Sequence, residues 1–303
     1  MPSLASLGDA GVAQRLAAGL TLATGPFRFR VRSTLPIVAR NIALLYAAAP
    51  LVADDAETLH DFHVRIVRVG GARRWWRPQV DFEVDELRPF RPLPADHAYA
   101  LLEWGMNWCI AGQCHEHLVL HAATLEREGC CVILSGAPGR GKSTLAAAMM
   151  LAGWRLLTDE LTLYDATRHA VQPLARPLSL KNESIAVIRA RAPDAAFGDI
   201  ARDTHKGTVS HLRVSARSAE AVDQPARPTH IVFPRWERGG ATSLQRRPKA
   251  EAFMELADQA FNYSLLGRAG FDANARLIDS CACWSLRHGE LDPALDALAS
   301  LAS

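Results

Sequence analysis

Residues 136–143 read Gly136-Ala-Pro-Gly-Arg-Gly-Lys142-Ser143 and fill every fixed position of G-x-x-x-x-G-K-[ST], a glycine-rich loop that binds phosphate. Residues 130–135 before the loop are an apolar run of strand length, and residues 143–152 after it favour a helix. A strand, a glycine loop and a helix in this order point backbone N–H groups and a helix N-terminus at one place, which suits an anion. The stretch therefore predicts a nucleoside triphosphate site.

Within this loop the residue types have separate expected tasks. Lys142 is expected to reach the β- and γ-phosphates, and the hydroxyl of Ser143 is expected to hold Mg²⁺. ATP and Mg²⁺ are therefore the expected cofactors. The predicted nucleotide-binding residues are Gly136, Ala137, Pro138, Gly139, Arg140, Gly141, Lys142, Ser143 and Thr144.

An acidic pair, Asp159-Glu160, follows the loop helix closely. It ends residues 154–158, which are predicted to be the next strand, and only sixteen residues separate it from Lys142. Two adjacent carboxylates can supply a metal ligand and a base that accepts a proton. In many motor-type ATPases the acidic pair lies much further along the chain. The short spacing favours an enzyme that transfers a phosphoryl group to an acceptor.

The arrangement resembles the HPr kinase/phosphorylase family, in which a histidine opens a strand and is followed by a phosphate loop and an acidic pair. Here these are His121, the loop at Gly136 and Asp159-Glu160. The resemblance is closest to the HPr-kinase-related kinases of type A. It covers most of the chain after about residue 80, with similar segments at residues 102–109, 153–160, 176–184, 204–212 and 261–263.

This resemblance implies an ATP- and Mg²⁺-dependent kinase that phosphorylates a hydroxyl, with serine of a protein or peptide as the best-known acceptor. It implies that Asp159 is the catalytic base and that Glu160 lies nearer the metal. His121 would orient Asp159 or touch the transferred group, and Lys142 completes the predicted catalytic set. A homo-oligomer is suggested by the resemblance alone.

The expected fold is α/β, in two parts. The resemblance implies a P-loop kinase core of the HPr kinase C-terminal type in residues 116–303, with a mixed sheet and flanking helices. Residues 1–115 are expected to form a smaller, strand-rich α+β unit, because apolar and polar residues alternate at residues 27–32 and 61–68. This unit is a candidate for recognising the acceptor or another partner.

Phosphoryl transfer spreads negative charge over the equatorial oxygens, and enzymes commonly place an extra cation against it. Lys206, Arg176 and Arg213 are the candidates for this role. Lys206 precedes a glycine in a polar segment, and Arg176 precedes a proline that favours extended backbone.

Composition excludes several classes of partner. The 34 basic and 32 acidic residues nearly cancel, which argues against bulk affinity for nucleic acid or a membrane surface. The cation–aromatic mixture at residues 73–77 is short and is predicted to be a turn, and the basic stripe at residues 27–32 is predicted to be a solvated strand face or a surface for an acidic partner. No signal peptide or membrane-length apolar run is evident, so a cytoplasmic location is expected.

Two alternatives remain open. One is a nucleotide-gated regulatory ATPase, because an acidic pair can activate water instead of an alcohol. The other is a kinase for a small-molecule hydroxyl. The chain also departs from HPr kinase at Ala137-Pro138, where the family has acidic and small polar residues, and at Glu160, where it has a second aspartate. The acceptor and any phosphorylase activity therefore stay undecided by the sequence.

Overall fold

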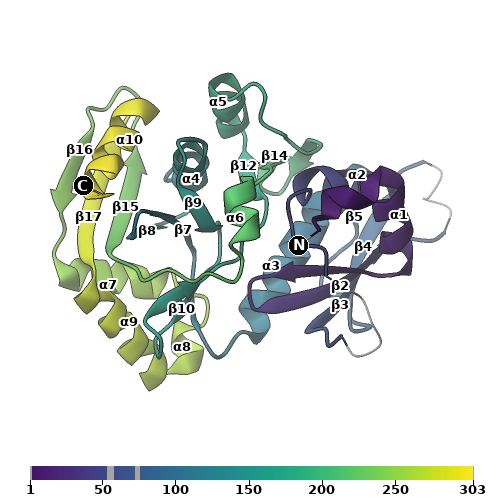
Figure 1. Ribbon diagram of the computed structural model, residues 1–303, viewed down its shortest axis with the longest axis horizontal. Helices are drawn as coiled ribbons and strands as arrows, with labels where there is room; N and C mark the ends of the chain where they lie inside the picture. Colours follow the sequence, from purple (N-terminus) through teal and green to yellow (C-terminus); the bar gives the residue numbers. More distant parts are fainter. Residues whose placement is uncertain (1, 53–57, 72–75, 303) are drawn as a thin grey trace. The chain divides into compact units, whose positions relative to one another are not determined.

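The computed structural model describes residues 2–52, 58–71 and 76–302 and shows a mixed α/β protein (Figure 1). The chain divides into two compact units. The first comprises Met1–Ile110 and Arg176–Glu220, and the second comprises Ala111–Ala175 and Ala221–Ser303. The predicted boundary after residue 115 lies close to Ile110, where the chain first passes from the first unit to the second. The segment Arg176–Glu220 was predicted to be part of the kinase domain, and it groups with the first unit.

A five-stranded sheet forms the centre of the first unit, with the alternation predicted from the sequence. Along the strand at residues 27–33, Phe29 and Val31 are buried, whereas Arg28 and Arg32 on the other face are exposed. Residues 72–75, which include most of the predicted cation–aromatic turn, lie outside the described residues. The strands in sheet order are β1 (Leu20–Thr24), β2 (Phe27–Ser33), β3 (Phe62–Arg68), β4 (Gln79–Val84) and β5 (Leu93–Pro94).

Helices and a second, smaller sheet complete the first unit. Gly105 packs so closely against Phe82 of β4 that a Cβ atom there would lie 2.1 Å from the Phe82 ring, so only glycine fits. The small sheet has the order β12 (Leu178–Lys181), β14 (Gly207–Leu212), β13 (Ala201–Thr204). The helices are η1 (Leu4–Leu7), α1 (Gly8–Ala18), α2 (Pro36–Leu45), η3 (Ala95–His97), α3 (Ala98–Gln113), α5 (Glu183–Arg191) and α6 (Ala216–Glu220).

Buried polar contacts hold the segment Arg176–Glu220 within the first unit. Arg176 donates to a carboxylate oxygen of Glu103 at 2.7 Å and to the side-chain oxygen of Asn107 at 2.8 Å. The hydroxyls of Tyr46 and Tyr99 donate to the other carboxylate oxygen of Glu103, at 2.9 and 2.7 Å. Such groups are costly to bury unless they are paired, so this network fixes where the segment packs.

The second unit is built on a six-stranded mixed sheet. β8, β15 and β17 run parallel, whereas β7 is antiparallel to both of its neighbours, β8 and β9. β9 therefore points the same way as β8. The strands in sheet order are β16 (Ser243–Arg246), β17 (Ala282–His288), β15 (His230–Trp236), β8 (Cys130–Ser135), β7 (Ala122–Arg127) and β9 (Arg155–Thr158).

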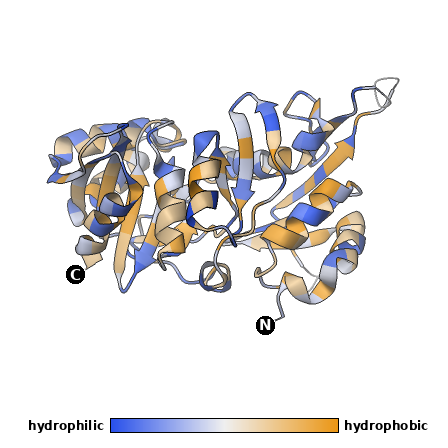
Figure 2. Cartoon of the chain, turned by 90° about the horizontal axis from the view of Figure 1, so that it is seen from above, coloured by the Kyte–Doolittle hydropathy of each residue, from blue (hydrophilic) through white to orange (hydrophobic). Residues whose placement is uncertain are grey.

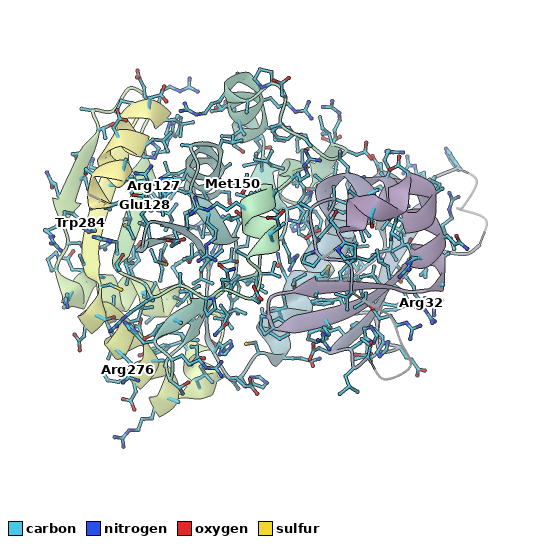
Figure 3. All side chains as sticks on the ribbon, in the orientation of Figure 1. Arg32, Arg127, Glu128, Met150, Arg276 and Trp284 are labelled. Atoms are coloured by element: carbon cyan, nitrogen blue, oxygen red, sulfur yellow. The ribbon has the colours of Figure 1, made fainter. Side chains whose placement is uncertain are left out.

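A turn at Glu128 and Gly129 joins β7 to β8, as predicted, and both residues have positive φ. Figure 3 labels Glu128 there beside Arg127, whose guanidinium lies 4.7 Å from the ring centroid of Trp154. This turn closes the amino edge of β8, so the phosphate loop leaves from the opposite edge of the sheet.

The remaining elements of the second unit cover this sheet or extend it. Helices in Figure 2 carry both hydrophobic and hydrophilic residues, as expected where one side packs on a sheet. A small sheet has the order β11 (Ala170–Gln172), β10 (Thr162–Asp165), β6 (Leu118–Leu120). The helices are α4 (Lys142–Leu151), α7 (Lys249–Asp258), α8 (Tyr263–Leu266), α9 (Arg268–Ser280), α10 (Leu291–Ala299) and η4 (Ser300–Ala302). None of the helices in the described ranges has both the length and the apolar character needed to cross a lipid bilayer.

Candidate active site

Strand direction gathers the predicted site residues of the second unit at one edge of the six-stranded sheet. β8 and β9 end at this edge, so the loop after Ser135 and the acidic pair after Thr158 both start there. β7 runs the other way and begins at this edge, with Ala122 paired to Ser135. His121, which precedes β7, is therefore brought to the same edge as the loop and the acidic pair.

The phosphate loop has the backbone that its glycines predict. Gly136, Gly139 and Gly141 have φ angles of 138°, 80° and 89°, a region that L side chains rarely adopt. α4 begins directly after Gly141, at Lys142. The Lys142 ammonium group donates to the carbonyl oxygens of Gly136 and Ala137, at 2.5 and 3.2 Å. The loop thus holds its own lysine against its backbone, beside the start of the helix.

A hydrogen bond links the start of the loop helix to the acidic pair. The hydroxyl of Ser143, in the first turn of α4, donates to Oδ1 of Asp159 at 3.1 Å. Two neighbouring ligands of an octahedral Mg²⁺, each about 2.1 Å from the ion, lie about 2.9 Å apart. The hydroxyl and carboxylate oxygens are of the kind that binds Mg²⁺, and their separation of 3.1 Å is compatible with two neighbouring ligands.

A complete protein cage for a metal is not needed at such a site. No group of three or more His, Cys, Asp or Glu in the described part of the chain is arranged to hold a metal ion. Mg²⁺ is commonly held by one or two protein oxygens together with phosphate oxygens of the substrate, and it keeps several waters. The Ser143–Asp159 pair fits that mode of binding.

A tight turn ends β9 immediately after Asp159. Glu160 has a φ of 71°, and the Leu161 amide donates to the carbonyl oxygen of Asp159 at 3.0 Å. The Thr158 hydroxyl donates to the carbonyl oxygen of Leu161 at 2.6 Å and fixes the turn. Non-glycine residues with positive φ are strained and cluster at functional sites.

His121 is held by a distant segment of the same unit. Its amide donates to the carbonyl oxygen of Gln259 at 2.7 Å, and its ring lies 5.9 Å from that of Phe261. Asn262, which is 2 % exposed, accepts from the Val119 amide and donates to two carbonyl oxygens before β6. Residues 259–262 therefore position His121 through backbone and amide hydrogen bonds.

Two residues that the sequence analysis missed lie against the loop. A Cβ atom on Gly136 would lie 3.3 Å from a carboxylate oxygen of Glu255 in α7, and Glu255 forms an ion pair with Arg247 at 2.7 Å. Trp236, at the end of β15, has its Cβ 3.4 Å from where a Cβ of Gly141 would be. No local motif marks either residue, because both reach the loop only through the packing of distant elements.

The three predicted transition-state cations all belong to the first compact unit, not to the unit that carries the loop. Arg176 is 7 % exposed and is held by Glu103, so its charge already has a buried counterion. The Lys206 ammonium lies 5.3 Å from the ring centroid of Trp104, a cation–π contact, and Arg213 is exposed. The buried ion pair gives Arg176 a structural explanation that does not involve the phosphate.

Comparison with known proteins adds no family assignment: no protein-family model matches the chain, and no curated protein matches it either. The functional argument therefore depends on the loop, Ser143, the acidic pair and His121.

Proposed function

We propose that this protein is a Mg²⁺-dependent kinase that transfers the γ-phosphoryl group of ATP to a hydroxyl, with a serine of a protein or peptide as the acceptor. The main support for the proposal is the 3.1 Å hydrogen bond between Ser143 and Asp159, because Ser143 is the last residue of a complete phosphate-loop sequence. This contact joins the residue expected to bind the metal to a carboxylate, at the start of a helix whose N-terminus favours anions.

In this proposal the chain mainly positions groups and balances charge. The loop amides and Lys142 would bind the β- and γ-phosphates, and Ser143 with Asp159 would hold Mg²⁺. A bound Mg²⁺ would supply positive charge that offsets the negative charge of the phosphates. Phosphoryl transfer has a loose transition state, so placing the acceptor hydroxyl in line matters more than removing its proton early.

The hydrogen bond with Ser143 also bears on which carboxylate of the acidic pair would bind the metal and which would accept the proton of the acceptor hydroxyl. The sequence analysis gave Asp159 the role of base and placed Glu160 nearer the metal. Because Asp159 contacts the metal-binding hydroxyl, we now assign Asp159 to the metal and Glu160 to the acceptor proton. His121, at the same edge of the sheet, would orient one of these carboxylates or touch the transferred group.

The test is to incubate the purified protein with Mg²⁺ and γ-labelled ATP in an extract of its source cells. Asp159→Asn, Glu160→Gln and the control Asp258→Asn, which changes an exposed carboxylate on α7, are compared with the original protein. Label on one protein or metabolite that is lost only in the first two variants supports the kinase and identifies its acceptor. Label released only as free phosphate would instead support the regulatory ATPase.

The same variants separate the two carboxylate roles. Asp159→Asn should raise the Mg²⁺ concentration needed for half-maximal rate about tenfold or more, because a metal ligand is lost. Glu160→Gln should lower kcat with little change in the Mg²⁺ requirement, because the group that accepts the hydroxyl proton is lost. The opposite pattern would restore Asp159 as the base.

A further inference from the structure

The strand next to the phosphate-loop strand continues beyond it and ends in a tryptophan. β15 pairs with β8 in parallel up to Val232 and Leu134. β8 stops at Ser135, whereas β15 continues to Trp236. Trp236 therefore lies past the carboxyl end of β8, where the loop begins, and is still paired with His288 of β17. Its Cβ is 3.4 Å from the position that a Cβ of Gly141 would take, so the base of its side chain lies beside the last glycine of the loop.

The side chain of Trp236 is exposed but held in one orientation. The residue is 44 % exposed, and its indole N–H donates to the carbonyl oxygen of Gly289, just after β17, at 3.2 Å. The next residue, Glu237, forms ion pairs of 2.8 Å with Arg235 and with Arg287 of β17. These contacts connect the end of β15 to β17, so the position of the indole is fixed by both strands.

The direction of the bound nucleotide follows from the sheet order. Ser143 and Asp159 mark the metal and terminal-phosphate end, and Asp159 lies after β9. β7 and β9 are on one side of β8, and β15 and β17 are on the other. A triphosphate in the loop with its γ-phosphate towards Asp159 extends its nucleoside away from β9. That direction leads to the loops after β15 and β17, where Trp236 lies.

We propose that the indole of Trp236 stacks on the nucleobase of the nucleotide bound in the phosphate loop, an inference that rests on the proposed ATP site. Aromatic stacking on a base is favourable and tolerates every base, because each base has a π face. Trp236 thus supplies affinity for the nucleoside part of the ligand without choosing between adenine and guanine. It contributes nothing to the triphosphate part, which the loop and Lys142 bind.

The experiment compares the binding of three ligands by calorimetry: ATP, GTP and inorganic tripolyphosphate, each with Mg²⁺. The variants are Trp236→Ala, Trp236→Phe, which keeps an aromatic ring, and Trp76→Ala, a control at an 84 % exposed tryptophan of the first unit. Trp236→Ala should bind ATP and GTP about tenfold more weakly, or about 1.4 kcal/mol, with unchanged tripolyphosphate affinity. Trp236→Phe should lose much less affinity, and Trp76→Ala should lose none.

Three results would overturn the inference. ATP affinity that survives Trp236→Ala would exclude stacking, and an equal loss for ATP and tripolyphosphate would mean that Trp236 only supports the loop. Equal affinity of the original protein for ATP and tripolyphosphate would mean that the base contributes no binding energy. Retained tripolyphosphate binding also shows that the alanine variant is folded.

Photolabelling of the original protein with 8-azido-ATP provides a measurement that needs no variant, because the label should attach to the peptide that contains Trp236. Labelling confined to another peptide would refute the inference. The outcomes also separate it from the proposed function. Trp236-dependent binding of ATP without any phosphoryl transfer would keep the stacking site and refute the kinase.

Discussion

Replacing Arg176 by methionine should destabilise the first compact unit strongly, because this residue is half of a buried ion pair. The side chains of Arg176 and Glu103 are 8 % and 4 % exposed and lie 2.7 Å apart. An exposed pair contributes about 0–1 kcal/mol, whereas removal of one member of a buried pair costs about 3–5 kcal/mol, since the other charge stays buried without its partner. We expect the larger cost here, because Glu103 would lose the charge of Arg176, while the hydroxyls of Tyr46 and Tyr99 that it would keep are neutral.

Urea unfolding and thermal melting measure this cost. A unit of roughly 150 residues loses about 2–4 °C in Tm per kcal/mol, so Arg176→Met should lower its Tm by about 10 °C. Arg213→Met, at an exposed arginine of the same unit, should change stability by less than about 0.5 kcal/mol. The double variant Glu103→Leu with Arg176→Met should be less destabilised than the sum of the single variants, since no buried charge remains.

The same ion pair predicts the direction of a pH effect. Burial has the largest effect and raises the pKa of Glu103, but the charges of Arg176 and His211 and the hydrogen bonds from Arg176 and Tyr99 together outweigh it, so the net pKa lies below its usual value. The ionised carboxylate therefore stabilises the unit above the pKa of about 4.3 that an unfolded glutamate has, and this stability is lost as the pH falls towards the lower folded-state pKa. Arg176→Met should weaken this acid dependence.

One result would refute the reasoning about Arg176. If Arg176→Met were as stable as Arg213→Met at neutral pH and had lost phosphoryl transfer, the buried pair would not stabilise the fold. Arg176 would then regain the role of transition-state cation that the sequence suggested.

Three further predictions concern the second unit. Gly141→Ala should weaken tripolyphosphate binding at least about tenfold in calorimetry, because a φ of 89° strains alanine; unchanged affinity would contradict the loop geometry. Asn262→Ala should cost about 2–4 kcal/mol in urea unfolding, since it leaves buried backbone groups such as the Val119 amide without their hydrogen bonds; a cost below about 1 kcal/mol would contradict this. Burial raises the pKa of Cys281 to about 12, so this thiol should react with a thiol reagent at pH 8 only after unfolding, and rapid reaction in the native protein would contradict its burial.

The strand, glycine loop and helix at residues 130–151 were predictable because the information for them is local. The glycine positions required by positive φ, the strand before them and the helix after them all lie within about twenty residues. The meeting of Ser143 with Asp159 is also nearly local, since one helix and one return strand separate them. Short-range patterns of this kind specify a strand–loop–helix unit almost completely.

Other features could not be predicted because they depend on pairing between distant segments. Arg176 packs within the first unit against Glu103, far earlier in the chain, which provides its counterion. Trp236 lies beside Gly141 only because β15 pairs with β8, and neither strand carries a pattern that specifies this partner. The sequence around an arginine that precedes a proline, or around a tryptophan at a strand end, does not show whether the residue binds a ligand or only stabilises the fold.

The direction of one strand explains how a histidine comes to the site. A strand parallel to β8 would place the residue before it at the amino edge of the sheet, far from the loop. β7 is antiparallel, so the residue before it, His121, lies at the edge where β8 ends in the loop and β9 ends in Asp159. The hydrogen bonds from residues 259–262 then hold the start of this strand in place. The sequence resemblance to HPr-kinase-type proteins grouped four segments that are far apart in the chain: a histidine, a loop, an acidic pair and a later Phe-Asn-Tyr segment. In the fold all four meet at one sheet edge, and this is the physical reason for treating them as one candidate site.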